Sequence, residues 1–415
     1  MFPKLLCIIL LLLLMGLFLL PFIKTKSSSL SLPPQEVLIE RAALSVQSFL
    51  SKFYDPQHQY FRDHYTFLNQ PSSSSSGLTA YWTFAQGFNA IVDNALRVSQ
   101  NFTSRNRTDL TFPQYVKLIS DLYTGQDKIG WERPYIDDMN WMALTLFWSY
   151  QLTRNQTYFE RCLYLYSKIV VNWDVTCCGT MKGGIWWDYE HSQKATASNA
   201  GPALLASLLY QETQEEHYLE FSQQVFSFWF ENMVLKNGEH MYSVCDHISA
   251  QNGFKECQWR FTYNEGLMIG AATNLYKVTR NETYLQIAMK IANFMITHEV
   301  IDTKSSMIDN GPILFDGNNC ESDCMQFKGI GFRYLQFLFT TQLNDFTKKS
   351  DNSLSKIQNV LQNSVQSLWE SARTKELNLF SVQWQGPPQD LNSKFYQAQV
   401  NSAVMALSLS VIQQL

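Results

Sequence analysis

The chain repeats one helical hairpin three times, and this repeat narrows its fold more than any other feature. Each copy has an apolar segment rich in small residues, at residues 138–150, 198–210 and 264–276. A short polar turn follows each segment and ends at Tyr158, Tyr218 or Tyr284, so the copies are 60 and 66 residues apart. An apolar helix is predicted before each turn and an amphipathic helix after it. The repeat therefore predicts a fold built from stacked helical hairpins.

The same alternation extends along the chain. The predicted apolar helices are residues 81–98, 138–152, 198–212, 264–278, 327–343 and 397–412. The predicted amphipathic helices are residues 35–53, 112–122, 158–171, 217–233, 284–298 and 357–372. A helix that is apolar nearly all round is buried, and a helix with one apolar face borders water. The predicted fold is all-α: an (α/α)6 barrel in which six outer helices surround six buried ones, closed by pairing its first and last elements.

An open helical solenoid is the alternative that this alternation allows. Six hairpins without polar capping repeats favour a closed ring. The loops that lead into the apolar helices are long and rich in Trp, Gly and Asn, whereas turns such as residues 153–157 are short. Long loops at one end of a repeat indicate a binding surface, and in a ring they meet on one rim.

The N-terminus is predicted to be a targeting segment. Residues 5–20 are apolar and uncharged, Lys4 precedes them, and Pro21, Lys24 and Lys26 follow. The run is long for a signal peptide and short for a full membrane span, and no Ala-x-Ala-like cleavage site follows. A cleaved signal peptide and a type II anchor both stay open, and the length favours the anchor. We expect residues 1–32 to be leader and linker, with membrane attachment available through residues 5–23, and residues 33–415 to form the (α/α)6 domain.

Sequons and cysteines agree with the secretory pathway. Four Asn-x-Thr sequons begin at Asn101, Asn106, Asn155 and Asn281. Seven cysteines follow the leader, and Cys245 with Cys257 and Cys320 with Cys324 are predicted local bridges in an oxidising compartment. The odd number leaves at least one thiol unpaired or paired between chains. We expect the folded domain to be secreted, or anchored with this domain luminal or extracellular.

Composition excludes one class of partner and leaves another open. The net charge is −4 and there is no Lys/Arg run, which argues against nucleic acid. The aromatic content of 14% suits a protein that binds polysaccharide. The cysteines and histidines lack zinc spacing, and phosphate or dinucleotide loops are missing from the sequence, so neither a metal nor a cofactor is predicted.

Two adjacent acids, Asp137 and Asp138, carry the predicted chemistry. Each charge disfavours ionisation of the other, so one can stay protonated while the other stays ionised. Glycoside hydrolysis needs such a pair, and adjacent carboxylates are closer to the roughly 5 Å of retaining enzymes than to the wider inverting gap. The alternative is an acidic helix cap. A structural cap would recur at each helix start, yet the equivalent positions in the other copies hold Tyr263-Asn264 and Ala197-Ser198. The asymmetry favours catalysis.

Aromatic and polar residues are predicted to surround the acid pair. Four tryptophans fall at positions that should face the same rim, namely Trp82, Trp131, Trp186 and Trp187, although core packing is the alternative for each. Trp186 and Trp187 follow two glycines in a predicted loop and are the favoured pair for stacking on sugar. Asn199, Asn264 and Lys328 stand at the starts of other apolar helices, where they could bind hydroxyl groups or support the helix end.

These residues resemble family 76 of the glycoside hydrolases, the endo-α-1,6-mannanases. The resemblance rests on five segments in family order, which cover most of the chain after the leader: Tyr135-Ile-Asp-Asp-Met-Asn-Trp141, Gly183-Gly-Ile-Trp-Trp-Asp188, Ser198-Asn199, Tyr263-Asn-Glu-Gly-Leu267 and Gln326-Phe-Lys-Gly-Ile330. The double aspartate is the most specific of them. Two places depart from the family pattern, at Cys178-Gly-Thr-Met-Lys-Gly-Gly184 and at Glu265, where a glutamine often follows Tyr-Asn.

The resemblance implies an (α/α)6 catalytic domain that cleaves α-1,6-linked mannose chains with retention, with a mannose-containing polysaccharide or glycan as partner. Asp137 would be the nucleophile and Asp138 the acid/base. The implied substrate-binding residues are Trp82, Trp131, Tyr135, Trp186, Trp187, Asn199, Tyr263, Asn264, Phe327 and Lys328. Fungal relatives resemble cell-wall transglycosylases that act on glycolipid anchors, so transfer is an alternative to hydrolysis. An inverting glycosidase, a lyase and a non-catalytic mannan-binding lectin on the same ring also stay open.

Overall fold

The structure is a computed structural model, which describes residues 33–67, 77–106, 109–175, 182–305, 308–318, 320–344 and 352–412. Residues 34–415 form one compact unit, to which the description below applies. The predicted leader lies outside the described residues. Among the residues that are described, no helix is both long enough and apolar enough to span a membrane.

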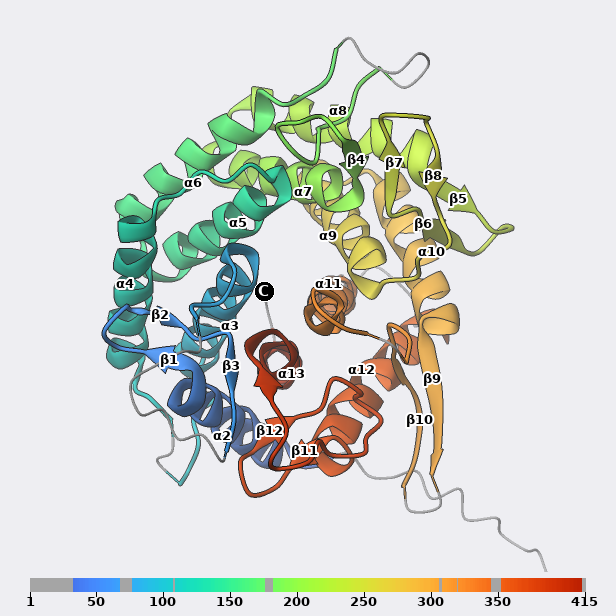
Figure 1. The fold of residues 1–415 in the computed structure, drawn as a ribbon. Coiled ribbons are helices and arrows are strands. Elements are labelled where there is room, and N and C mark those ends of the chain that lie inside the picture. Colours follow the sequence, from blue (N-terminus) through green and yellow to red (C-terminus); the bar gives the residue numbers. More distant parts are fainter. Residues whose placement is uncertain are drawn as a thin grey trace, which may run out of the picture. The chain divides into compact units, whose positions relative to one another are not determined.

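Six apolar helices stand around a common centre as an inner ring (Figure 1). They are α3 (Tyr81–Ser99), α5 (Ile136–Thr153), α7 (Thr196–Thr213), α9 (Thr262–Thr279), α11 (Cys324–Asn344) and α13 (Gln397–Leu409). These helices are buried nearly all round; in α7 every residue from Thr196 to Leu209 is buried. Because both sides of such a helix contact protein, apolar and small residues occupy all of its faces.

Six amphipathic helices surround the inner ring. They are α2 (Gln35–Phe53), α4 (Phe112–Ile129), α6 (Gln156–Val170), α8 (Glu216–Met233), α10 (Glu282–His298) and α12 (Asn352–Glu370). Within the hairpins α5 packs on α6, α7 on α8 and α9 on α10. The described residues thus contain all twelve predicted helices, in the predicted order, and the (α/α)6 prediction is confirmed.

One helix, α4, continues seven residues beyond its predicted end and finishes at Ile129. Gly125 lies in this extension, and glycine weakens an isolated helix. A Cβ at Gly125 would lie 2.1 Å from the carbonyl oxygen of Gln59. Only glycine allows the loop that contains Gln59 to pack this closely against the helix. A tertiary contact therefore accounts for a residue that helix propensity disfavours.

The repeat is visible in the hairpin turns. Helices α5, α7 and α9 end before a left-handed residue, namely Arg154, Gln214 and Arg280, with φ between 55° and 59°. In two of the turns an asparagine then caps the outer helix: Asn155 accepts from the N–H of Thr157 at 3.1 Å, and Asn281 from that of Thr283 at 3.0 Å. The Asn-x-Thr pattern at these two sequons therefore also serves as a helix cap.

The ring is closed by its two ends. Helix α13 packs on α2 and α3. Strand β13 (Phe395–Tyr396) pairs antiparallel with β3 (His64–Tyr65), and the Asn94 amide donates to the Ser408 hydroxyl at 2.8 Å. Closure of this kind distinguishes the (α/α)6 barrel from an open solenoid.

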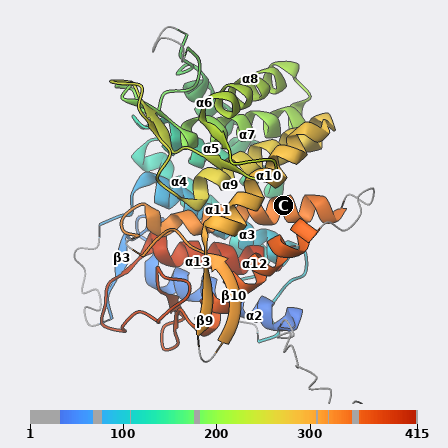
Figure 2. The same cartoon turned by 90° about the vertical axis from the view of Figure 1, so that its right-hand side faces the viewer.

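Short strands, which the sequence did not predict, decorate the connections. Two-stranded antiparallel pairs are β1 (Tyr54–Asp55) with β2 (Tyr60–Phe61), β5 (Val234–Lys236) with β6 (Tyr242–Val244), β9 (Val300–Ser305) with β10 (Ile308–Leu314) and β11 (Arg373–Thr374) with β12 (Leu379–Phe380). A three-stranded sheet contains β4 (Gln193–Ala195), β7 (His247–Ser249) and β8 (Lys255–Glu256). The side view shows the long β9–β10 hairpin beside the helices (Figure 2).

Both predicted disulfides are present, Cys245–Cys257 and Cys320–Cys324. Each lies in a connection between hairpins of the ring. Cys162 is a buried free thiol on α6. Cys177 and Cys178 lie outside the described residues.

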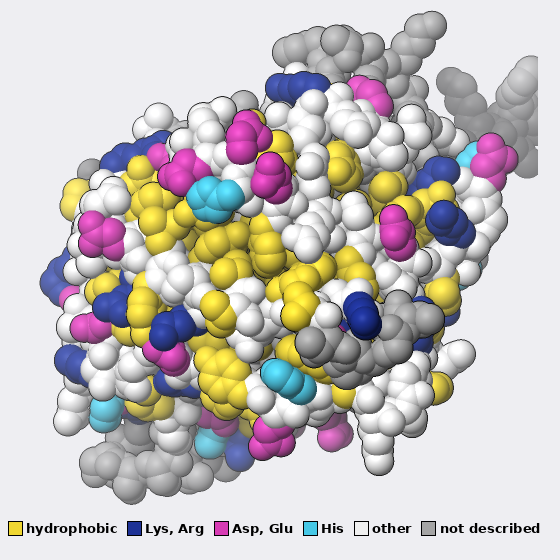
Figure 3. Space-filling view, turned by 90° about the horizontal axis from the view of Figure 1, so that it is seen from above, with side chains coloured by type: hydrophobic (Ala, Val, Ile, Leu, Met, Phe, Trp, Pro, Cys, Tyr) yellow, Lys and Arg dark blue, Asp and Glu magenta, His cyan; other side chains and the backbone are white. Residues whose placement is uncertain are grey.

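The outer face seen in Figure 3 carries acidic and basic side chains interspersed around hydrophobic ones. The basic side chains drawn there do not gather into a patch. This distribution agrees with the mildly acidic net charge.

Candidate active site

The acid pair lies in the first turn of α5. The helix begins at Ile136, two residues before its predicted start, so Asp137 and Asp138 both belong to the helix and not to the preceding loop. The loop that contains Trp187 fixes this start, because the Ile136 N–H donates to the Trp187 carbonyl at 2.7 Å. Tyr135 occupies the cap position without a side-chain cap bond. The carboxyls are therefore positioned by the first turn of a helix whose cap residue makes no side-chain cap bond.

The two carboxyls have raised pKa values for partly different reasons. Burial is the main cause for both, and it raises the pKa of Asp137 to about 7 and that of Asp138 to about 8. The negative charge of Asp137 is the second cause at Asp138, and Asp323 adds to the effect at both. Hydrogen bonds from the Trp187 indole and from backbone N–H groups oppose the shift at Asp137. Asp137 is thus the acid that ionises more readily.

Different neighbours flank the two carboxyls. Trp187, which donates to Asp137, packs against Tyr135 at 4.7 Å between ring centroids, and Tyr135 is 41% exposed. On the Asp138 side the Arg133 guanidinium lowers the pKa of that acid and lies 4.5 Å above the Tyr81 ring. An aromatic pair therefore borders one acid, and a cation held on an aromatic ring borders the other.

A third carboxylate, Asp323, faces the pair from the start of α11. It is exposed and accepts a hydrogen bond from the Trp82 indole at 3.0 Å. The Trp82 ring lies 6.2 Å from Phe327, which lies 4.1 Å from Tyr263. The sequence predicted a disulfide beside Asp323 but did not assign this acid to the site. The adjacent predicted bridge, Cys320–Cys324, was the available signal.

Asp246 is a second acid that the sequence did not single out. Its buried carboxylate accepts from the Tyr263 hydroxyl at 2.7 Å and from the Asn264 amide at 3.0 Å. Its other oxygen contacts His247 Nδ1 at 2.8 Å. Asp246 therefore holds both predicted residues of the first turn of α9 in place. It directly follows Cys245, so its position beside a predicted bridge was a signal here as well.

Aromatic rings continue outward from Tyr263 and Phe327. Phe261 lies 5.1 Å from Phe327, Trp259 lies 6.1 Å from Phe261, and His247 lies 5.5 Å from Trp259. Trp259 is 51% exposed, and its N–H and that of Gln258 are held by the Glu256 carboxylate. We call the rings of Trp82, Phe327, Tyr263, Phe261 and Trp259 the aromatic strip. It leads away from the acid pair and presents ring surface of the kind that sugars stack on.

Three predicted substrate-binding residues are buried and occupied by internal contacts. Trp131 donates to Asp127 at 2.6 Å, and Trp186 stacks on His191 at 4.7 Å. Asn199 is fully buried: its oxygen accepts from the Ile185 N–H at 2.7 Å and its amide donates to two carbonyls. Their burial and internal contacts favour support of the rim over contact with a substrate.

A buried ionisable cluster lies behind the first turn of α9. Asp316 accepts from the Thr262 N–H at 2.6 Å and from its hydroxyl at 3.0 Å, and so caps α9 from a distant loop. Burial lowers the pKa of Lys328, another predicted substrate-binding residue, and the charge of Asp316 opposes this shift. The Nζ of Lys328 has no hydrogen-bond partner among the described residues. Glu265 is buried here too and pairs with Glu299. Glu265, where the sequence departs from the family pattern, thus lies behind the rim.

Within the described ranges, no three His, Cys, Asp or Glu side chains are grouped to hold a metal ion.

A closed ring of helical hairpins with an adjacent, partly protonated acid pair at one rim defines a carbohydrate-active class of protein. The chain belongs to glycosyl hydrolase family 76, whose family model matches residues 38–414.

Relatives agree with this membership. The chain is 26% identical over 183 residues to the mannan endo-1,6-alpha-mannosidase DCW1 of Candida glabrata, a match that covers 41% of this chain and 38% of the relative. The chain thus matches well under half the length of that curated relative.

Two solved structures share the fold. One is the alpha-1,6-mannanase GH76A of Salegentibacter sp. HEL1_6, an inactive variant with two consecutive aspartates replaced by asparagine, in complex with alpha-1,6-mannotriose; it has a TM-score of 0.72 at 21% identity, covering 91% of this chain and 99% of that chain. The other is a family 76 glycoside hydrolase (mannosidase) from Bacteroides thetaiotaomicron, with a TM-score of 0.75 at 18% identity, covering 90% and 98%.

Proposed function

We propose that the protein cleaves α-1,6-linked mannose chains from within, with retention of the anomeric configuration. The observation that carries this proposal is the adjacent acid pair in which burial raises both pKa values and hydrogen bonds favour ionisation of Asp137. Family membership supports it, as do the similar proteins: one is a mannan endo-1,6-alpha-mannosidase, and another is an inactive double-aspartate variant of an alpha-1,6-mannanase bound to alpha-1,6-mannotriose.

Each acid has its own task in the proposed reaction. Ionised Asp137 attacks the anomeric carbon and forms a glycosyl ester, while protonated Asp138 gives its proton to the departing glycosidic oxygen as that bond breaks. Asp138, now ionised, then takes a proton from water, whose oxygen displaces Asp137 from the sugar. An acceptor hydroxyl in place of water gives transfer, the transglycosidase alternative. Desolvation of Asp138 keeps the acid protonated near neutral pH, as the first step requires.

The aromatic strip is the proposed track for the sugar chain, with Tyr135 and Trp187 on the other side of the acids. Trp82, Tyr263 and Phe327 keep part of their surface accessible, as does Trp187. We also propose that the protein acts in the secretory pathway or outside the cell, either secreted or anchored. Its two disulfides and its sequons support this location.

The test compares the purified protein with Asp137→Asn and Asp138→Asn on linear α-1,6-mannan, with anomer-resolved NMR of the first products. We expect short α-mannosides from the wild type and at least about a thousand-fold loss in each variant, because both acids act in the rate-limiting chemistry. Both variants should melt like the wild type. Asp121→Asn, at an acid of α4 that pairs with Lys117 away from the site, is the matched control and should keep full activity.

Each other outcome selects a different function. First products of β configuration would refute retention. Transfer to an added acceptor sugar in place of hydrolysis would assign the transglycosidase function. Mannan binding without any product would identify a lectin. Full activity of either Asp137→Asn or Asp138→Asn would refute the residue assignment.

A further inference from the structure

Two of the three equivalent hairpin turns carry an Asn-x-Thr sequon at the same position. Asn155 in the turn after α5 and Asn281 in the turn after α9 are the cap residues of the outer helices that follow. The turn after α7 has Glu215 at this position. The backbone of the cap residue is nearly the same in all three, with φ between −77° and −87° and ψ between 109° and 113°. The turns are therefore one structure that occurs three times, twice with a sequon.

The hydrogen bonds of these turns show which atoms the cap uses. Oδ1 of Asn155 and of Asn281 accepts from the backbone N–H two residues later, at 3.1 and 3.0 Å. The Nδ2 atom of each asparagine donates to no group in the described part of the chain. Residues 154–157 and 280–283 are all exposed. The amide nitrogen that a glycan would modify is thus accessible, while the amide oxygen is the atom that supports the helix.

Helix capping alone does not account for the threonines of the two sequons. The cap bond uses only the backbone N–H of Thr157 or Thr283, which any residue except proline would supply. In the second copy His217 stands at this position, and the turn forms without any side-chain cap bond. Threonine is also only a moderate helix former. The threonine hydroxyl is therefore needed by the sequon and not by the turn.

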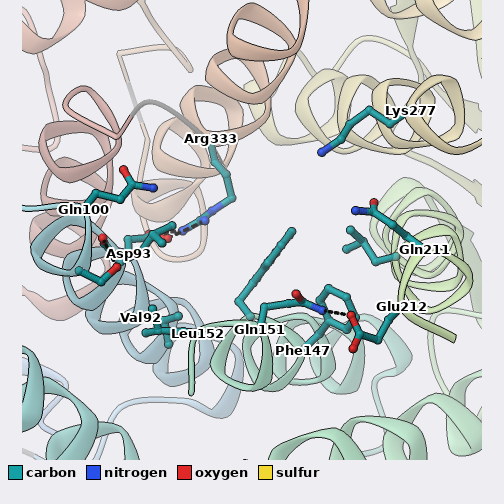
Figure 4. Close-up of a pocket in the computed structure, with 14 residues that line it drawn as sticks. Val92, Asp93, Gln100, Phe147, Gln151, Leu152, Gln211, Glu212, Lys277 and Arg333 are labelled. Carbon is teal, nitrogen blue, oxygen red and sulfur yellow. Dashed lines mark hydrogen bonds and ion pairs between the residues drawn. The ribbon is translucent and has the colours of Figure 1, made fainter. Parts of the chain in front are cut away.

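The turns lie at the end of the ring opposite the acid pair. Figure 4 shows Gln151, Glu212 and Lys277, which come from the C-terminal parts of α5, α7 and α9, around one cavity of about 470 Å³. The three turns directly follow these parts of the helices. Asp137 and Thr153 are sixteen residues apart on α5, so this end is separated from the acids by roughly 24 Å along the helix axis. A glycan on either turn would be attached away from the candidate active site.

We propose that Asn155 and Asn281 carry N-linked glycans at this end of the ring, while their side-chain oxygens still cap α6 and α10. The proposal rests on the proposed entry of the protein into the secretory pathway. In the reaction Nδ2 forms a bond to the anomeric carbon of an oligosaccharide carried on a lipid diphosphate. The bond from that carbon to the diphosphate oxygen breaks, and the amide gives one proton to the departing lipid diphosphate. The product keeps Oδ1 as an acceptor, so the cap survives the modification.

Peptide mass spectrometry of the full chain, expressed in eukaryotic cells, tests this proposal. Peptide N-glycanase in heavy-oxygen water converts each glycosylated asparagine to a labelled aspartate, and a sample without the enzyme corrects for spontaneous deamidation. We expect the label at Asn155 and Asn281 in most molecules, and label at only one would overturn the proposal for the other. Free thiols are counted in the same sample. Unlabelled asparagines with both disulfides formed would overturn the glycan proposal alone, whereas unlabelled asparagines with reduced cysteines would overturn the proposed location as well.

Two variants of the first turn separate the glycan from the cap. Thr157→Val should remove the label from Asn155 and keep the cap bond, because that bond uses a backbone N–H. After deglycosylation its Tm should equal that of the wild type, since asparagine and aspartate cap helices equally well. Asn155→Ala removes glycan and cap together and should lower Tm by about a degree or two. An equal loss of stability in Thr157→Val would give the hydroxyl a structural role and overturn the argument from the threonines.

The second copy of the turn provides a gain-of-function test. Glu215→Asn combined with His217→Thr completes a sequon in a turn of the same geometry, and we expect label at position 215. Glu215→Asn alone is the matched control, because it supplies the asparagine without the threonine, and it should stay unlabelled. An unlabelled double variant would overturn the argument from turn geometry. None of these measurements depends on the proposed catalytic function.

Discussion

At the scale of single residues, neighbours give two identical side chains different pKa values. Asp137 and Asp138 are adjacent, equally short and both desolvated, yet only Asp137 receives the Trp187 indole and the backbone N–H groups at the helix start. Asp138 instead experiences the charge of Asp137, which Arg133 only partly offsets, whereas the charge of Asp323 acts on both acids. The difference in pKa follows from what each carboxyl contacts.

Asp246 is expected to act as a positioning residue, because it holds Tyr263 and Asn264 without facing the solvent. Asp246→Asn replaces a charged acceptor by a neutral one, which weakens each bond by about 1 kcal/mol. We expect kcat/KM on α-1,6-mannan to fall roughly ten-fold. A double-mutant cycle with Tyr263→Phe measures the coupling, and additive losses would show that Asp246 does not act through Tyr263.

Trp259 is expected to contribute to binding of long substrates only. It is half-exposed at the end of the aromatic strip. Trp259→Ala should raise KM on long mannans about five- to ten-fold, in the range of one lost stacking contact, and leave kcat unchanged. Phe254→Ala removes a similarly exposed ring, 55% accessible, from the same segment but outside the strip, and should have no effect. Equal changes in the two variants would argue against the strip as a sugar track.

At the scale of elements, α9 and α10 meet in a buried pair of carboxyl groups. Glu265 of α9 accepts the Val244 N–H at 2.9 Å and pairs with Glu299, which follows the end of α10. Burial raises the pKa of Glu265 to about 7, and burial together with the Glu265 charge raises that of Glu299 well above its ordinary value. We therefore expect the two carboxyl groups to share a proton.

This pair should make stability fall with rising pH. A raised pKa in the folded state means that the contribution is present below about pH 4.5 and lost as pH rises through the folded values. We expect the free energy of unfolding to decrease between pH 5 and pH 8, by about 2 kcal/mol more in the wild type than in Glu299→Gln. Urea unfolding at several pH values measures the difference, and parallel curves for the two proteins would show that the proton is not shared.

At the scale of the whole molecule, ring closure requires close approach between helices. Helices α11 and α13 approach each other closely at Gly329, whose N–H donates to the Ser402 hydroxyl at 2.8 Å. A Cβ at Gly329 would lie 2.9 Å from the backbone of Ser402. The small residues of the inner helices therefore allow six helices to fit around one centre.

Gly329→Ala should destabilise the ring as a unit. Overpacking at a backbone contact costs about 1–3 kcal/mol, which corresponds to a decrease in Tm of a few degrees. We expect one cooperative transition, because an opened α11–α13 contact exposes the whole inner ring. Gly77→Ala, where a Cβ would meet no atom within 4 Å, is the control and should melt like the wild type. Two separate transitions in calorimetry would indicate that the ring unfolds in independent segments.

Much of this architecture could be predicted because its signals are local. The alternation of apolar and amphipathic helices, the turns before Tyr158, Tyr218 and Tyr284, and the two cysteine pairs all depend on residues near each other in the chain. The acid pair was also recognisable, because it is asymmetric within a repeat. The strands were not predicted, since most are two or three residues long and depend on pairing partners.

The site was predictable only in part, because residue type does not determine which way a side chain faces. Trp186 and Trp187 are neighbours in one loop, yet Trp186 stacks inside on His191 while Trp187 donates to Asp137. Asp246 and Asp323 reach the rim from segments that carry no catalytic motif.

The sequence by itself determined the helices, their order, the closed ring and the position of the acid pair, because periodicity and repeat spacing are written along the chain. Only the tertiary structure decided which aromatic rings stay accessible and which acids lie near the pair. Burial, hydrogen bonding and pKa values depend on atoms brought together from distant segments, and their energies exist only once those segments have packed.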